Sequence, residues 1–377
     1  NEMKEGKMKK NLIILMIDGG RLDRAKKSSV FNQIKEKSTF LSQPITYGPH
    51  TIASMHAVFS GSYGNRTGTN SYWSTYDFKS NKFKTISEYL HESEYYTCAD
   101  TVSKLTIPKQ GLDELNIHDE VNDNLILRHK DFLKIMKEKN KNGKPFFLYL
   151  QYSNIHTGIM QQVLKKYNNF SEEFFNKKKE NEIRYDKLFF NAEDYVNNIL
   201  NEINELELNN QSIILIMSDH GISTGEKIGE RAYGAFCYDY TLRTFAYFIG
   251  NDFPIKEIDQ QVRTIDFMPT ILEMLNIPLS EEFEKIDGVS LLPLIQGKIV
   301  SEKMAFSETG NPLKERSPPK NPNVKSIRTS KWKLILNQFN DTREFYDLKN
   351  DPEEKNNLSG KGLEKEDFFW DELKKHL

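Results

Sequence analysis

The sequence predicts an α/β fold in which helices cover both faces of a mostly parallel β-sheet, followed by a small antiparallel sheet. Three short apolar runs, at 11–17, 145–152 and 212–217, have the length and composition of fully buried parallel strands. Helical patterns lie between these runs, and the pattern changes after Gln296. Alternation of strands and helices over roughly 280 residues is typical of a three-layer sandwich.

The order of the predicted elements also suggests how the chain is divided. Helical patterns occupy 83–93, 124–139 and 172–208, and the loop sequence SPPKNPN precedes strand patterns within 326–337 and 343–348 and a helix at 365–376. We therefore expect three parts. They are a charged N-terminal tail (1–10), a catalytic domain (11–300) and a C-terminal α+β subdomain built on the antiparallel sheet (301–377).

Composition excludes several classes of protein. The 377 residues carry a net charge of −2, which gives no electrostatic basis for binding nucleic acid. Two cysteines, Cys98 and Cys237, cannot form a disulfide framework, and no run reaches the ~18 apolar residues of a transmembrane segment. The chain opens with Asn1, so we expect a cytoplasmic protein as given, or an exported one if a signal peptide has been removed. The sequence does not indicate an oligomeric state.

Polar side chains follow each of the three predicted strands. Asp18 follows the first strand, His156 lies just beyond the second, and Asp219 and His220 follow the third. A single Asp after a strand is most often a helix N-cap. The carboxyl ends of parallel strands meet at one edge, however, and ligands bind there in open α/β sheets. Three polar strand ends together therefore favour a functional site.

Six segments in order resemble the sulfatase branch of the alkaline phosphatase superfamily. The first strand with Asp18 resembles the metal-binding start of that fold. In TIASMHAVFSG, Thr51 occupies the nucleophile position of the family signature, ten residues before Gly61, and Ser54 matches the signature serine. The other four segments are SDHG with GEKIGE, YDYTLRTFAYFIG, IDFMPTILEMLNIP with DGVSLLPLIQG, and KWKLILN with EFYDLKNDPEEKNNL. The resemblance implies the fold predicted above and an ester hydrolase.

Departures from the family pattern affect the expected substrate. Residue 51 is Thr rather than the Cys or Ser that sulfatases convert to formylglycine, and Ala53, Met55 and Gly19 replace the family's Pro, Arg and second Asp. The resemblance thus implies cleavage of a phosphate or phosphonate ester, first of all a diester, on a small molecule or a glycan- or lipid-linked group. Three alternatives stay open: a sulfuric ester hydrolase, a phosphoglycerol or phosphoethanolamine transferase, and a binding protein without turnover.

A threonine hydroxyl needs activation to attack phosphorus or sulfur, and a divalent cation can provide it. Asp18, Asp219 and His220, with the hydroxyl of Thr51, offer three oxygens and one imidazole. This set suits Mn²⁺ or Zn²⁺, and Mg²⁺ or Ca²⁺ would also be accepted.

The resemblance further implies that one metal binds rather than two. Two-zinc relatives add an Asp four residues before the His that follows the middle strand, and another His near the C-terminus. Here Tyr152 stands four residues before His156, and no histidine lies between His220 and His376.

The remaining candidates would contact substrate. His156 could protonate the leaving oxygen or bind an oxygen of the ester, or it could close a buried hydrogen-bond network. By resemblance Lys104, Lys227 and Arg231 are candidate substrate ligands, although Lys104 lies two residues from the usual spacing. The alternative for each is a solvated surface charge. His50 could face the cleft, and Thr51 could also serve as a helix N-cap.

Overall fold

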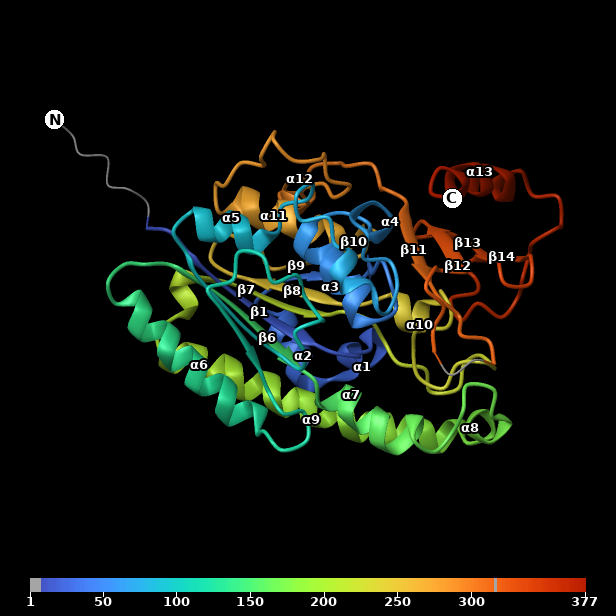
Figure 1. The fold of residues 1–377 in the computed structure, drawn as a ribbon, viewed down its shortest axis with the longest axis horizontal. Helices are drawn as coiled ribbons and strands as arrows, with labels where there is room; N and C mark the ends of the chain where they lie inside the picture. Colours follow the sequence, from blue (N-terminus) through green and yellow to red (C-terminus); the bar gives the residue numbers. More distant parts are fainter. Residues whose placement is uncertain (1–7, 315–316) are drawn as a thin grey trace.

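The computed structural model describes residues 8–314 and 317–377, and an eight-stranded sheet forms its centre (Figure 1). Strand β8 is antiparallel to its neighbours β7 and β2, and all other neighbouring strands in the sheet are parallel. Across the sheet the order is β5 (Glu114–Ile117), β4 (Tyr96–Thr101), β6 (Phe146–Tyr152), β1 (Asn11–Ile17), β7 (Ser212–Ser218), β8 (Ala246–Ile249), β2 (Thr39–Leu41) and β9 (Lys256–Ile258). The predicted α/β fold with its mostly parallel sheet is confirmed.

Helices cover both faces of this sheet, as Figure 1 shows. Alternate residues of β1 point to opposite faces, so Ile13 and Leu15 belong to one apolar core, and Leu12 and Ile14 to the other. The first core is covered by α1 (Leu22–Lys27), α2 (Ser29–Lys35), α6 (Leu125–Asn140) and α9 (Lys178–Glu205). The second is covered by α3 (Thr51–Ser60), α5 (Ile86–Glu92), α11 (Phe267–Met274) and α12 (Leu292–Ile295).

The helix predicted at 172–208 is two helices rather than one. Helix α8 (Glu172–Asn176) ends before Lys177, whose φ of −103° and ψ of 30° are not helical, and α9 begins at the next residue. The other short elements are α4 (Gly64–Thr67), α7 (Asn154–Ile159), α10 (Asp239–Leu242), the paired strands β3 (Pro44–Ile45) and β10 (Val262–Arg263), 3₁₀ turns at Ser74–Asp77, Asn209–Gln211 and Thr264–Asp266, and a π-helical turn at Met160–Leu164.

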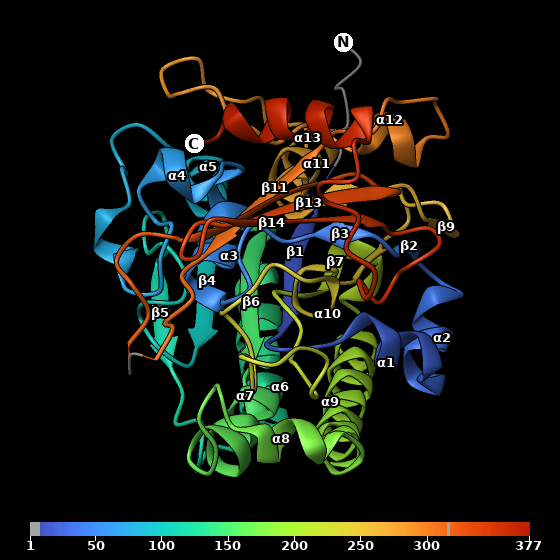
Figure 2. The same cartoon turned by 90° about the vertical axis from the view of Figure 1, so that its right-hand side faces the viewer.

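A second sheet of four antiparallel strands lies beside the main body, with helix α13 (Glu364–Lys374) near it (Figures 1 and 2). Its strands are β11 (Ala305–Thr309), β12 (Val324–Arg328), β13 (Trp332–Asn337) and β14 (Thr342–Asp347). The predicted C-terminal antiparallel sheet is confirmed, although β11 was not predicted. Phe306 and Leu334 share an apolar core with Ala53 and Ala57 of α3, so this sheet packs directly on the helix that begins at Thr51.

Two other expectations concern the chain as a whole. Most of the predicted charged tail falls on residues 1–7, outside the described residues, and the domain boundary at residue 300 stays a prediction. None of the described helices combines the length and apolar character needed to span a bilayer.

Candidate active site

Asp18, Asp219 and His220 come together at the carboxyl ends of two neighbouring strands. Strands β1 and β7 pair in parallel with Ile17 opposite Ser218, so the residues that follow each strand emerge side by side. The Nε2 atom of His220 lies 3.5 Å from Oδ1 of Asp18 and 3.4 Å from Oδ2 of Asp219. All three side chains are buried, which makes this group a candidate cation site.

The chemistry of this group fits a divalent cation. Oδ1 of Asp18 and Nε2 of His220 are buried without a hydrogen-bond partner among the described residues. Such orphaned groups are costly unless something pairs with them. Burial raises the pKa of Asp219 to about 6, although the neighbouring His220 lowers it. A divalent cation would satisfy both orphaned atoms and offset the repulsion between two buried carboxylates.

Neighbouring groups hold these carboxylates in position. Nε2 of Gln151, on β6, donates to Oδ2 of Asp18 at 2.9 Å, and the N–H of Gly19 donates to Oδ1 of Asp219 at 3.0 Å. Gly19 adopts a positive φ of 78°, and the Tyr185 hydroxyl on α9 donates to its carbonyl at 2.7 Å. The backbone N–H of Gly19 is thus one of the groups that hold Asp219 in place. Gln151 and Tyr185 were not predicted from the sequence, because both lie in segments patterned as core.

Thr51 is the first residue of helix α3, and its hydroxyl points at the cluster. Oγ1 of Thr51 donates to Oδ2 of Asp219 at 2.6 Å. The N-cap of this helix is His50, whose Nδ1 accepts from the N–H of Ala53, so the Thr51 side chain is not the cap. Ser54 fixes the start of the helix by donating to the carbonyl of Asp219 at 3.0 Å. The positive end of the ten-residue helix therefore faces the place where an anionic group would bind.

His156 is joined to this cluster through Tyr233. Its Nε2 lies 2.8 Å from the hydroxyl of Tyr233, and the Tyr233 ring lies 4.6 Å from the His220 ring, centroid to centroid. Burial alone would lower the pKa of His156, but contact with Glu120 and the charge of Asp18 raise it above its ordinary value. The distance from Nδ1 to Oε2 of Glu120 is 3.5 Å. His156 is thus placed to hold a proton near the cluster. Tyr233 was not predicted from the sequence.

A cavity of about 660 Å³ extends from this site. His50 and Tyr233 line it where it meets the cluster, and Arg231 also lines it. The segments 309–314 and 318–319 of the C-terminal region contribute several further lining residues. Lys227 does not line this cavity. Its Nζ donates to the carbonyl of Glu354 and lies over the ring of Tyr238.

Lys104 also lies away from the cavity lining. It is exposed in the loop that follows β4. Among the four candidate substrate ligands, the structure therefore brings His50 and Arg231 to the cavity, and the roles of all four stay predictions.

Fold and site together define an α/β protein with a candidate metal centre at the carboxyl ends of two inner strands of a mostly parallel sheet. The chain belongs to the sulfatase family, since residues 10–277 match the sulfatase model and residues 236–377 match the C-terminal region of N-sulphoglucosamine sulphohydrolase. Members of this family generally bind a divalent metal. The predicted membership is confirmed.

Solved sulfatase structures share the fold at low sequence identity. BT4656, solved with its substrate D-glucosamine-2-N,6-O-disulfate, is 16% identical with a TM-score of 0.74, and 97% of each chain is covered. BT1596, described as a 2-O GAG sulfatase, is 16% identical with a TM-score of 0.72, over 98% of this chain and 90% of that one. A Bacteroides thetaiotaomicron protein described in the metabolism of multiple glycosaminoglycans is 15% identical (TM-score 0.71; 98% and 99% covered). No curated protein matches the chain in sequence. At these identities the likeness shows a shared fold.

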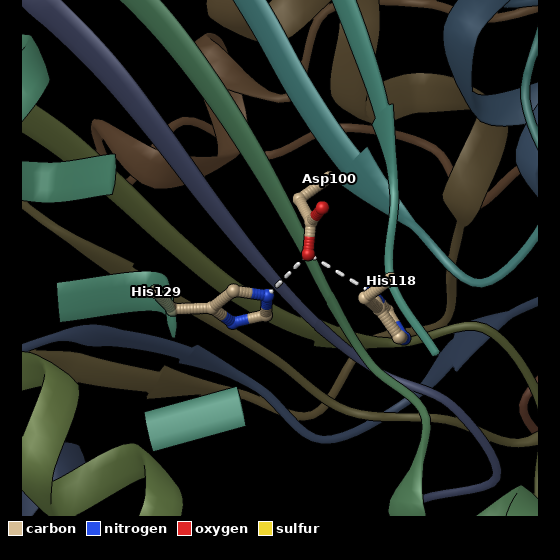
Figure 3. Close-up of side chains that lie close together, drawn as sticks. All are labelled: Asp100, His118 and His129. Atoms are coloured by element: carbon tan, nitrogen blue, oxygen red, sulfur yellow. Dashed lines mark hydrogen bonds and ion pairs between the residues drawn. The ribbon is translucent and has the colours of Figure 1, made fainter. Parts of the chain in front are cut away.

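A second group of buried ligand-type side chains is formed by Asp100 of β4, His118 just after β5 and His129 of α6 (Figure 3). Oδ2 of Asp100 lies 2.9 Å from Nδ1 of His118 and 2.8 Å from Nε2 of His129. The guanidinium of Arg128 pairs with Oδ1 of Asp100 at 2.8 Å. The positive charge of Arg128 already neutralises the carboxylate, which disfavours a cation at this place.

The outer nitrogens of these two histidines are also bonded. Nε2 of His118 lies 2.8 Å from Oγ of Ser153, and Nδ1 of His129 lies 2.6 Å from the hydroxyl of Tyr195. Every hydrogen-bonding group is satisfied when both rings are neutral and carry their protons toward Asp100. In contrast to the site at Asp18, this group needs no ion. We interpret it as a buried hydrogen-bond network, which was not predicted from the sequence.

His129 should make the protein less stable in acid. Burial lowers its pKa, so the folded state resists protonation that the unfolded chain accepts at about pH 6.5. The stability due to neutral His129 is therefore present above that pH and is lost as the pH falls below it. We expect the free energy of unfolding of the metal-free wild type, measured in urea, to fall between pH 7 and 5 more steeply than that of His129→Asn. Parallel pH curves for the two proteins would contradict this role.

Proposed function

We propose that the protein hydrolyses an organic sulfate ester and that Thr51 is the attacking group. The observation that carries the proposal is the 2.6 Å contact between Oγ1 of Thr51 and Asp219, beside a buried cluster suited to a divalent cation. Family membership supports the sulfate class, and so do the structurally similar proteins described as acting on sulfated sugars and glycosaminoglycans. A small molecule or a glycan bearing a sulfate ester is therefore the substrate class we propose.

The metal would be held by Asp18, Asp219 and His220, with the hydroxyl of Thr51 beside it. When bound there, a divalent cation supplies positive charge that stabilises anionic oxygens and lowers the pKa of a nearby hydroxyl. Mn²⁺ and Zn²⁺ remain the ions we favour, because the cluster combines carboxylate oxygens with one imidazole.

The residues of the site support a two-step reaction. Thr51 gives its proton to Asp219 as Oγ1 bonds to sulfur, and the bond from sulfur to the leaving oxygen breaks while His156 protonates that oxygen. Water then attacks the sulfur of the sulfated Thr51, passing a proton to His156. The bond to Oγ1 breaks, and Thr51 recovers its proton from Asp219. The products are an alcohol and inorganic sulfate.

Hydrolysis of a phosphate or phosphonate ester is the second candidate, because one specific observation favours it. Residue 51 is a threonine, which cannot become the formylglycine that the resemblance associates with sulfatases. An alkoxide nucleophile is suited to phosphorus, and the same two steps apply with phosphorus in place of sulfur.

A paired assay separates the two candidates. We expect the protein loaded with Mn²⁺ or Zn²⁺ to cleave 4-nitrophenyl sulfate with a higher kcat/KM than 4-nitrophenyl phosphate or bis(4-nitrophenyl) phosphate. A higher value for either phosphate ester would reject the sulfate proposal and support the second candidate. Absence of metal-dependent release of nitrophenol from all three esters would contradict both.

A further inference from the structure

Arg231 carries a half-buried charge that no described carboxylate pairs with. Its Nη1 donates to the carbonyl of Leu164 at 2.8 Å, and its Nε donates to Oδ1 of Asn169 at 3.2 Å. Both acceptors are neutral, and burial lowers the pKa of Arg231. Two other largely buried arginines differ from it, since Arg21 pairs with Asp23 and Glu226, and Arg328 pairs with Asp239. An unpaired guanidinium in a partly buried position is unfavourable unless an anion binds to it.

The two hydrogen bonds of Arg231 also fix its orientation. Leu164 ends the π-helical turn that follows α7, and Asn169 lies in the loop after it, so two backbone segments hold the guanidinium in place. Arg231 lines the 660 Å³ cavity, and its other guanidinium N–H groups make no hydrogen bond to a described residue. A planar, preoriented guanidinium is well suited to carboxylate, sulfate and phosphate groups.

The charge of the other lining residues also favours an anionic ligand. Among the cavity's described lining residues the ionisable side chains other than tyrosine are Arg231, Lys314 and His50, and none is an Asp or Glu. Four aromatic residues also line it: Tyr72, Trp73, Phe170 and Tyr233. A volume of about 660 Å³ is in the range that holds a small organic ligand, so it can accept the alcohol part of an ester together with the ester group.

We infer that Arg231 forms a second anion-binding subsite, which selects esters whose alcohol part carries a further negatively charged group. This inference rests on the proposed function, because the reacting ester is taken to lie at the end lined by His50 and Tyr233. The second anionic group, whether carboxylate, sulfate or phosphate, pairs with Arg231, and a ring of the substrate lies against the aromatic lining. A substrate with a neutral alcohol part leaves Arg231 unpaired and binds more weakly.

Binding of matched ligands tests this subsite without turnover. The probes are phenyl sulfate and its 2-, 3- and 4-carboxyl derivatives, titrated calorimetrically into metal-loaded Thr51→Ala. At least one carboxyl derivative should bind on the order of tenfold more tightly than phenyl sulfate, as a charge-assisted hydrogen bond would produce. Adding Arg231→Gln should remove this preference and leave the affinity for phenyl sulfate unchanged, while Arg231→Lys should retain part of it.

Arg343→Gln is the matched control, because this exposed arginine lies over the ring of Trp370 and does not line the cavity. In the Thr51→Ala background it should leave the preference intact. The inference is overturned if Arg231→Gln weakens phenyl sulfate and the preferred derivative equally, or if Thr51→Ala binds the four probes alike or not at all. If Arg231→Gln does not fold, Arg231→Lys becomes the test. Full retention of the preference for the carboxyl derivative in this variant, which lacks the guanidinium group, would also overturn the inference. Failure of the ester assays would leave this binding preference measurable, so the two proposals fail separately.

Discussion

Thr51→Ala should lower kcat by at least about 10³-fold without unfolding the protein. The substitution removes the hydroxyl that contacts Asp219, while His50 still caps helix α3 and alanine favours a helical position. The loss should fall on kcat, because the hydroxyl makes its new bond during the reaction rather than on binding. The measurement is steady-state hydrolysis of the preferred nitrophenyl ester, with the melting temperature checked in parallel.

Thr51→Ser is the matched control for this prediction. Serine keeps a hydroxyl at the same position and should retain metal-dependent activity well above that of the alanine variant. Full activity in Thr51→Ala would show that the hydroxyl is not the attacking group.

Asp18→Asn should weaken metal binding by at least about tenfold, whereas His118→Asn should leave it unchanged. Asp18 lies in the cluster with orphaned buried atoms, and His118 lies in the network whose groups are already bonded. The asparagine at position 18 keeps the size of the side chain but removes the charge that attracts a cation. Equilibrium dialysis with Mn²⁺ or Zn²⁺, followed by elemental analysis, measures the affinity and the number of ions per chain.

The pair of variants decides between the two clusters. The wild type and His118→Asn should each hold one ion, in line with the single-metal expectation. If His118→Asn loses the metal and Asp18→Asn binds it normally, the ion lies in the cluster of Asp100, His118 and His129, which would contradict the account.

Strands β1, β6 and β7 could be predicted because they are buried on both faces, and this burial leaves a continuous apolar run in the sequence. Strands β2 and β9 have three residues each, and their pairing depends on neighbours more than 200 residues away in the chain. Such short strands leave no recognisable pattern. The break at Lys177 was missed because the apolar spacing continues on both sides of it.

In the site, Asp18, Asp219 and His220 follow recognisable strands, and their convergence follows from the parallel sheet. Thr51 was found through the family signature. Tyr233 was missed because loop geometry, and not periodicity, brings its ring against His220. Lys104 and Lys227 also lie in loops, and the conformation of a loop decides where such a side chain points. A long side chain in a loop can turn from the cavity, as Lys227 does toward Glu354.

The central claim is that Thr51 takes up the sulfuryl or phosphoryl group, and mass spectrometry after acid quenching tests it most directly. The protein is mixed with metal and the preferred ester, stopped during turnover and digested. The account predicts a peptide in which Thr51 alone carries the transferred group, and no adduct in Thr51→Ala. Steady turnover with an adduct on another residue, or a persistent adduct at residue 51 that water does not release, would contradict it.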